Sequence, residues 1–167
     1  MSKFKSPNIL VVLNNIRSSQ NVGSIFRTCD AVGVKKIILA GYTPTPIDRF
    51  GRENKGLTKA SLGAEKFVVW EKVESLSEVV KFDNTGSKNF VVVGVEQAKN
   101  SINYKNLKSQ IESSGFQNLI LIFGNEVEGL SESDLDHCGL VAEIPMQGQK
   151  ESLNVAVCAG IILFELV

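Results

Sequence analysis

The clearest indication of how this 167-residue chain folds is the run Leu119-Ile120-Leu121-Ile122-Phe123-Gly124-Asn125-Glu126. Its five consecutive apolar residues predict a strand that is covered on both faces, as the strands of a parallel sheet are. The glycine and the acid that follow predict a turn that can wrap a ligand at the carboxyl end of this strand, where open α/β sheets bind their ligands. A tight strand–helix turn without a ligand fits the same residues equally well.

Further short apolar runs lie on both sides of this stretch and alternate with helix-like patterns. The predicted strands are residues 9–13, 36–39, 67–70, 90–95, 119–123 and 140–144. The predicted helices are residues 21–32, 73–82, roughly 103–112, 132–137 and 152–166. Such alternation is typical of an α/β domain with a mostly parallel sheet and helices on both faces. The length of the chain suits a single domain, residues 1–167.

Composition argues against several classes of protein. No apolar run is long enough to span a bilayer, and no apolar segment follows the basic N-terminus as it would in a secretory signal. The cysteines Cys29, Cys138 and Cys158 are far apart, and His137 is the only histidine. This pattern argues against a zinc site or any other metal site, and against a disulfide framework. We expect reduced thiols in a cytoplasmic protein.

Charge is segregated along the chain although the net charge is zero. Residues 49–66 hold five basic side chains against two acids. Residues 111–149 hold seven acids and no lysine or arginine, and Lys150 comes directly after them. A basic face that contacts nucleic acid is one interpretation, and a solvated loop is the other. Zero net charge is unfavourable for a protein that binds duplex nucleic acid through phosphate contacts alone.

A second polar motif follows the first predicted strand and reads Asn21-Val22-Gly23-Ser24-Ile25-Phe26-Arg27. Gly23 allows a backbone or a ligand to approach the first turn of the predicted helix closely. Arg27 lies six residues after Asn21, about one and two-thirds helical turns away, so the two do not share one narrow stripe. Arg27 could point into a cleft at the edge of the sheet, or it could be solvated or ion-paired.

A third polar motif, Ile144-Pro145-Met146 to Ser152-Leu153-Asn154, links the last predicted strand to the last helix. Ser152 and Asn154 place a hydroxyl and an amide at a helix N-terminus. These side chains could cap the helix or take part in function. The helix that follows is apolar nearly all round, and only Gly160 and Glu165 interrupt it. It must therefore be covered on most sides, by the core or by a partner subunit.

Together the three motifs resemble those of the SpoU (TrmH-like) family of SPOUT methyltransferases, in the same order and spacing from about residue 8 onward. The resemblance implies a C-terminal deep trefoil knot, S-adenosylmethionine as cofactor and a homodimer. It also implies methyl transfer to a ribose 2′-hydroxyl of tRNA or rRNA. No dinucleotide fingerprint or Walker A loop supports a different nucleotide site. A non-catalytic, knotted RNA-binding or ribosome-assembly factor is the main alternative, and an unrelated nucleotide-binding domain is another.

The resemblance also implies roles for individual residues. The residues expected at the catalytic centre are Asn21, Arg27, Glu126, Ser152 and Asn154, of which Arg27 matches the family's catalytic arginine. Those expected to hold the cofactor are Gly94, Val95, Phe123, Gly124, Ile144, Met146, Ser152 and Leu153. Those expected to contact RNA are Arg27, Arg49, Arg52, Lys59 and Ser61.

Two features depart from the family's pattern. Val127 stands where many relatives have a second glycine after the glutamate, which would alter the shape of this loop. We also expect no N-terminal RNA-binding extension, so that RNA recognition would come from the domain itself or from a partner.

Overall fold

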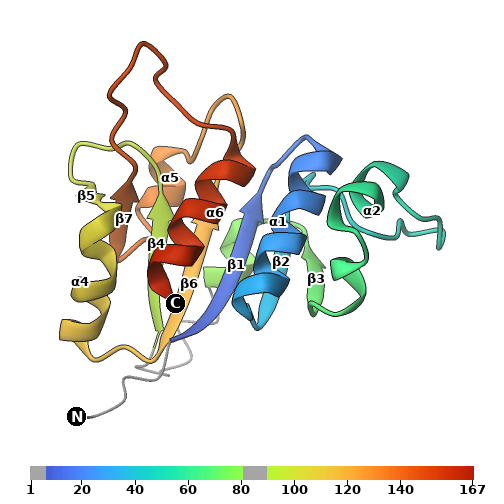
Figure 1. Cartoon of the computed structure of the whole chain (residues 1–167), viewed down its shortest axis with the longest axis horizontal. Coiled ribbons are helices and arrows are strands. Elements are labelled where there is room, and N and C mark those ends of the chain that lie inside the picture. The colour runs from blue at the N-terminus through green and yellow to red at the C-terminus, as the bar shows by residue number, and fades with distance from the viewer. Residues whose placement is uncertain (1–6, 81–89) are drawn as a thin grey trace.

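A parallel sheet forms the centre of the molecule (Figure 1). The computed structural model describes residues 7–80 and 90–167, and within these the sheet has seven strands. The strands are β1 (Asn8–Asn14), β2 (Lys36–Ala40), β3 (Trp70–Val73), β4 (Phe90–Val95), β5 (Ile102–Asn103), β6 (Asn118–Phe123) and β7 (Leu140–Glu143). Their order is β3-β2-β1-β6-β4-β7-β5, and every pair of neighbours is parallel. The predicted α/β class with a mostly parallel sheet is confirmed.

Helices cover both faces of this sheet. On one face lie α1 (Ser19–Val32), α4 (Leu107–Ser114) and α6 (Val155–Leu166), and α2 (Lys55–Ser61) packs against α1. On the other face lie α3 (Leu76–Val80) and α5 (Glu132–Leu135). The short 3-10 helices Ala64–Lys66 and Tyr104–Asn106 complete the described elements.

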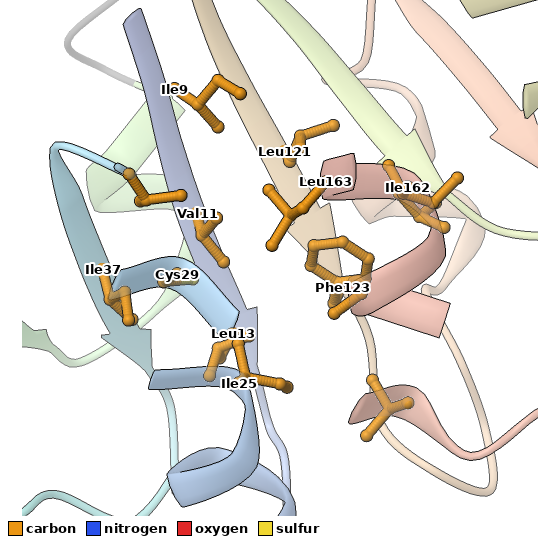
Figure 2. Packing of buried hydrophobic residues seen from close by; sticks show 14 of the residues in the cluster. Ile9, Val11, Leu13, Ile25, Cys29, Ile37, Leu121, Phe123, Ile162 and Leu163 are labelled. Atoms are coloured by element: carbon orange, nitrogen blue, oxygen red, sulfur yellow. The ribbon is translucent and has the colours of Figure 1, made fainter. Parts of the chain in front are cut away.

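The central strands are apolar throughout because each of their faces meets a separate hydrophobic cluster. Val11 and Leu13 of β1 pack into the larger cluster, whereas Val12 between them packs into the smaller one. Figure 2 shows the larger cluster, where side chains of α1 and α6 meet alternate residues of β1 and β6. This alternation explains why residues 119–123 read as an unbroken apolar run.

The chain leaves the two central strands in opposite directions. β1 continues through α1 to β2 on one side, whereas β6 continues through α5 to β7 on the other. The two connecting helices lie on opposite faces, as right-handed crossovers require. The carboxyl ends of β1 and β6 are therefore adjacent while their loops diverge, and this is where open α/β sheets form a binding crevice.

The differences from prediction lie at the margins of the sheet. The third strand is Trp70–Val73 rather than residues 67–70, since the pairing of Trp70 with Ile37 sets its register on β2. The predicted helix at 73–82 begins at Leu76, and its predicted end lies outside the described residues. Residues 103–112 form the end of β5, a 3-10 turn and most of α4. The helix α2 was not predicted.

In the described part of the chain, no helix is both long and apolar enough to pass through a membrane.

Candidate functional site

Two loops meet where β1 and β6 end, and Glu126 joins them. Its carboxylate accepts hydrogen bonds from the backbone N–H of Arg17 at 2.9 Å and of Ser18 at 3.0 Å. Partial burial opposes ionisation of this carboxyl, but the donated hydrogen bonds outweigh it and hold the pKa of Glu126 below its ordinary value. Glu126 is therefore an anion that fixes the loop before α1 against the loop after β6.

A chain of side-chain hydrogen bonds links all three polar motifs. The amide nitrogen of Asn21, in the first turn of α1, donates to Oε1 of Glu126 at 3.1 Å. The side-chain oxygen of Asn21 in turn accepts a hydrogen bond of 3.1 Å from the amide of Asn154. Asn154 is the N-cap of α6, and its oxygen accepts from the backbone N–H of Ala156 at 2.9 Å. The network Glu126–Asn21–Asn154 thus ties the starts of α1 and α6 to the loop after β6.

A cavity opens beside this network, at the carboxyl ends of β4, β6 and β7. Seven of the eight residues predicted to hold the cofactor line it: Val95, Phe123, Gly124, Ile144, Met146, Ser152 and Leu153. Glu126 lines it as well. The cavity therefore borders six predicted residues of the loop after β6 and the segment before α6: Gly124, Glu126, Ile144, Met146, Ser152 and Leu153.

Gly124 allows the loop after β6 to close tightly beside this cavity. A β-carbon at position 124 would lie 2.4 Å from the carbonyl carbon of Gly129 and 2.6 Å from the backbone nitrogen of Leu130. No side chain fits at that distance from backbone atoms. Glycine is therefore required at position 124 because the loop brings its own backbone too close for a side chain.

Two predicted site residues lie elsewhere in the structure. Gly94 does not line the cavity, because its free side faces Leu130, Leu135 and Cys138 on the smaller hydrophobic cluster. Ser61 is only 1% exposed, and its hydroxyl donates to the carboxylate of Glu65, with the carbonyl oxygen of Thr58 also within hydrogen-bond distance. This burial argues against a direct contact between Ser61 and RNA. The resemblance to the family implied this contact, and it stays a prediction that the burial of Ser61 does not favour.

Arg27 is exposed on α1 and does not line the cavity. Within residues 7–80 and 90–167 its guanidinium has no hydrogen bond or ion pair. It lies six helical positions after Asn21, or about 9 Å along the helix axis. The structure therefore brings Asn21, Glu126, Ser152 and Asn154 to the cavity or its network, and leaves Arg27 apart from them in the single subunit.

Gly23, in the same motif, is required for helix packing. A β-carbon there would lie 2.3 Å from the carbonyl oxygen of Leu57 and 2.8 Å from the β-carbon of Ala60. The close approach that the sequence predicted is thus the approach of α2 to α1.

Sequence reasoning missed two residues that shape the loop after β6. Asn125 is buried, and its amide donates to the carbonyl oxygen of Asn15 at 2.9 Å and to the hydroxyl of Tyr42 at 2.7 Å. The carboxylate of Glu96 accepts from the backbone N–H of Leu130 at 2.9 Å and lines the cavity. The position of Asn125 beside Gly124 was the available signal, whereas nothing in the sequence pointed to Glu96.

Val127 does not open this loop. Its side chain is 78% exposed, and its backbone does not need the left-handed conformation that favours glycine. Asn125 and Gly129 exchange backbone hydrogen bonds of 3.2 Å and 2.9 Å across it. The loop therefore closes with valine in place of the second glycine.

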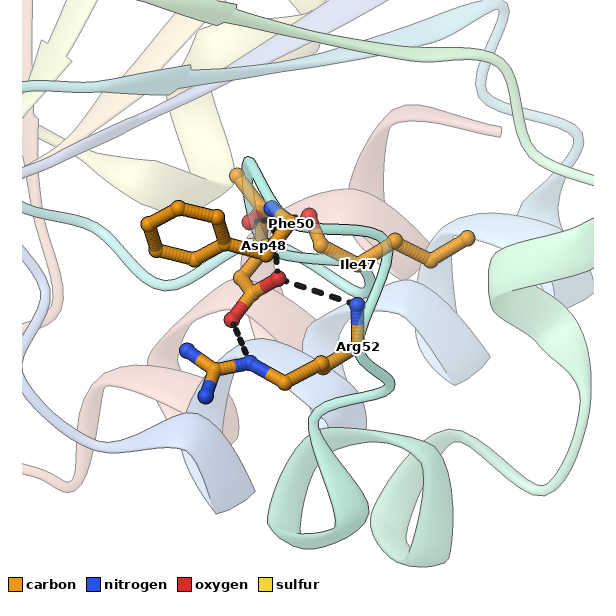
Figure 3. A network of polar contacts seen from close by, with 5 residues as sticks. Ile47, Asp48, Phe50 and Arg52 are labelled. Atoms are coloured by element: carbon orange, nitrogen blue, oxygen red, sulfur yellow. Dashed lines mark hydrogen bonds and ion pairs between the residues drawn. The ribbon is translucent and has the colours of Figure 1, made fainter.

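The other predicted RNA-binding residues, Arg49, Arg52 and Lys59, are all exposed after β2. The guanidinium of Arg52 pairs with the Asp48 carboxylate at 2.8 Å (Figure 3). Among the described residues, no group of three histidine, cysteine or acidic side chains could hold a metal ion.

Comparison with known proteins identifies the family. The model of the SpoU rRNA Methylase family matches residues 8–164, nearly the whole chain. The chain belongs to this family. A curated relative, the tRNA (guanosine(18)-2'-O)-methyltransferase of Aquifex aeolicus strain VF5, is 32% identical over 162 residues, which are 96% of this chain and 69% of the relative.

Solved SpoU structures match its fold. The AdoMet-bound rRNA methyltransferase of Sinorhizobium meliloti superposes with a TM-score of 0.82 at 27% identity. The SpoU methyltransferase AviRb of Streptomyces viridochromogenes, in complex with AdoMet, gives 0.80 at 27% identity. Each match covers 97% of this SpoU family member, which spans only 56% and 57% of those longer chains.

Proposed function

We propose that this chain transfers a methyl group from S-adenosylmethionine to a ribose 2′-hydroxyl of tRNA or rRNA. The observation that carries the proposal is the Glu126–Asn21–Asn154 network, which joins the three family motifs beside a cavity at the carboxyl ends of β4, β6 and β7. The names of the relatives support both the reaction and the two classes of RNA.

The cavity has the chemistry that S-adenosylmethionine requires. Part of its lining is apolar, as an adenine ring needs, and this part includes Phe123, Ile144 and Leu153. Carboxylates of Glu96, Glu128 and Glu143 stand at the same cavity and complement a cationic ligand. When bound, S-adenosylmethionine supplies an electrophilic methyl group on a positively charged sulfur. We propose that the cavity residues named above hold it.

Arg27 serves this reaction as a cation. A guanidinium stays protonated in proteins and cannot remove the proton of the ribose hydroxyl. We propose that Arg27 binds a phosphate next to the target ribose through paired hydrogen bonds and stabilises the negative charge that develops on the 2′-oxygen. Asn21, Ser152 and Asn154 would position the ribose, and Glu126 would hold the loops that carry them.

A homodimer would cover the outer side of α6. Val157 and Phe164 are exposed there, two helical turns apart, and Ile161 lies between them on the same stripe. Because Arg27 does not line the cavity of its own subunit, we propose that dimerisation over α6 and the neighbouring α1 brings it to the cavity of the partner. Mixed dimers of an Arg27→Ala subunit and a Leu153→Arg subunit should then regain activity at one of their two sites.

Two further parts of the proposal follow from the family. We propose that the chain forms the C-terminal trefoil knot, and support comes from the segment before α6 and the loop after β6, which line one cavity. We also propose that the protein acts in the cytoplasm, where free thiols such as Cys29 stay reduced.

The test is transfer of radiolabelled methyl from S-adenosylmethionine to total cellular RNA, fractionated by size and digested to nucleosides. We expect label in a 2′-O-methylnucleoside, and the labelled fraction will show whether tRNA or rRNA is the substrate. Label in a methylated base would overturn the ribose assignment. Binding of the cofactor with no label in any fraction would favour the non-catalytic RNA-binding factor.

A further inference from the structure

Residues 46–54, which we call the arginine hairpin, follow β2 on the side of the sheet where the strands have their carboxyl ends. Its two sides are joined by a hydrogen bond of 2.9 Å from Asn54 N to Pro46 O and by another of 2.9 Å from Asp48 N to Arg52 O. The carboxylate of Asp48 closes the tip, because it accepts from the backbone N–H of Phe50 at 2.8 Å and of Arg52 at 2.9 Å (Figure 3). The tip is therefore held in one conformation.

Phe50 stands at this tip and is 66% exposed. It is a member of neither hydrophobic cluster that the structure describes, so packing of the core does not account for it. The guanidinium carbon of Arg49 lies 4.7 Å from the ring centroid, and that of Arg52 lies 5.1 Å from it. Such contacts place two cations beside an aromatic ring that still faces solvent.

The hairpin is attached to the candidate site. Asn54 caps α2 by accepting from the backbone N–H of Leu57, and its amide donates to the hydroxyl of Ser19 at 3.0 Å. Ser19 is the first residue of α1, next to Ser18, whose N–H binds Glu126. A ligand held at the hairpin is thus held at a fixed position relative to the Glu126–Asn21–Asn154 network.

We propose that Phe50 is a stacking platform for an unpaired base of the RNA substrate, with Arg49 and Arg52 contacting the phosphates on either side. The inference rests on the proposed function and names the part of the RNA that the enzyme recognises. Bases in a duplex are stacked on their neighbours, whereas unpaired bases in loops can stack on aromatic and guanidinium planes.

Local charge favours RNA over an apolar partner at this surface. Residues 49–59 hold four basic side chains and one acid, although the whole chain has no net charge. A base stacked on an aromatic ring adds affinity that a small number of phosphate contacts would not supply by themselves. The platform would therefore let a protein with no net charge bind a polyanion, because one tightly held unpaired base replaces a long basic surface.

The test compares binding of a fluorescent single-stranded RNA of about 12 nucleotides with binding of the same strand in a duplex. We expect Phe50→Ala to weaken single-strand binding about 5- to 150-fold and to leave duplex binding unchanged. Phe50→Trp should retain binding because it keeps an aromatic face, and Phe50→Leu should not, although it stays apolar. Phe67→Ala is the matched control, since Phe67 is 79% exposed but lies before β3, at the amino-terminal ends of the strands and away from the hairpin.

Equal affinity of wild type and Phe50→Ala for the single strand would overturn the inference, and so would full binding by Phe50→Leu. Methyl transfer separates this inference from the proposed function. If wild type and Phe50→Ala methylate RNA with the same KM, the platform is refuted and the function stands. If neither methylates RNA but only wild type binds the single strand, the platform stands and the function is refuted.

Discussion

The side-chain amide of Asn154 donates a hydrogen bond of 3.1 Å to the side-chain oxygen of Asn21, across 133 positions of the sequence. The direction of this bond is set by Glu126, because its carboxylate is only an acceptor and takes the amide nitrogen of Asn21. The oxygen of Asn21 is then left for Asn154. A negative charge after β6 thus orients two amides at the starts of α1 and α6.

Asn154 has two tasks that substitution can separate. Asn154→Ser should keep the N-cap of α6 and lose only the link to Asn21, whereas Asn154→Ala loses both. We expect urea unfolding to show a cost of about 0.5–1 kcal/mol for the serine variant and about 1 kcal/mol more for alanine. Equal stability of the two variants would show that the cap contributes nothing.

Glu126 should make the contact between the loop before α1 and the loop after β6 dependent on pH, and weaker in acid. Because its pKa is lowered in the folded state, its contribution to stability is complete above the ordinary glutamate value of about 4.3 and is lost as pH falls through the lowered folded value. Glu126→Gln should therefore be less stable than wild type at pH 7, and the gap should narrow in acid. Thermal unfolding from pH 7 to pH 3 measures this, and a gap that widens in acid would contradict it.

Gly23 should not tolerate a side chain. A β-carbon would overlap the carbonyl oxygen of Leu57, so we expect Gly23→Ala to cost about 2–3 kcal/mol of unfolding free energy and to separate α2 from α1. The control is Ser24→Ala in the next position of the same helix, with a change under about 0.5 kcal/mol. Wild-type stability of Gly23→Ala in denaturant titration would refute this packing.

Phe164 should control the oligomeric state. Its ring is 60% exposed on α6, and a charge there would have to be buried in the proposed dimer. We expect Phe164→Asp to be a folded monomer in analytical ultracentrifugation while wild type is a dimer. Glu165→Gln, at the neighbouring exposed position, should leave the dimer intact. A monomeric wild type would refute the dimer directly.

The sequence predicted the parts of the fold that are buried on two sides. β1, β4 and β6 were found because both of their faces are covered, which leaves a continuous apolar run. The edge strand β3 and the two-residue β5 are defined by their pairing with β2 and β7, and no local pattern carries that information. The helix α2 was missed because it has seven residues, of which only Leu57 and Ser61 are buried.

The site could be predicted as far as residue types reveal it. Asn21, Glu126 and Asn154 stood out as polar residues at element ends, and the structure joins them. Glu96 and Asn125 were missed because they hydrogen-bond to the backbone of a neighbouring loop, at Leu130 and Asn15. The burial of Ser61 against Glu65, which is itself buried, could not be read from the sequence either. The distance of Arg27 from its own cavity depends on how helix α1 is oriented, which the motif does not specify.

The most direct test of the proposed chemistry is the rate of a single methyl transfer to RNA by wild type, Arg27→Lys and Arg27→Ala, with S-adenosylmethionine affinity measured in parallel. The charge role of Arg27 predicts unchanged cofactor affinity, measurable transfer by the lysine variant and a loss of at least about 10²-fold in the alanine variant. Transfer by Arg27→Ala at the wild-type rate would contradict the account, because no cation at position 27 would then take part in the reaction.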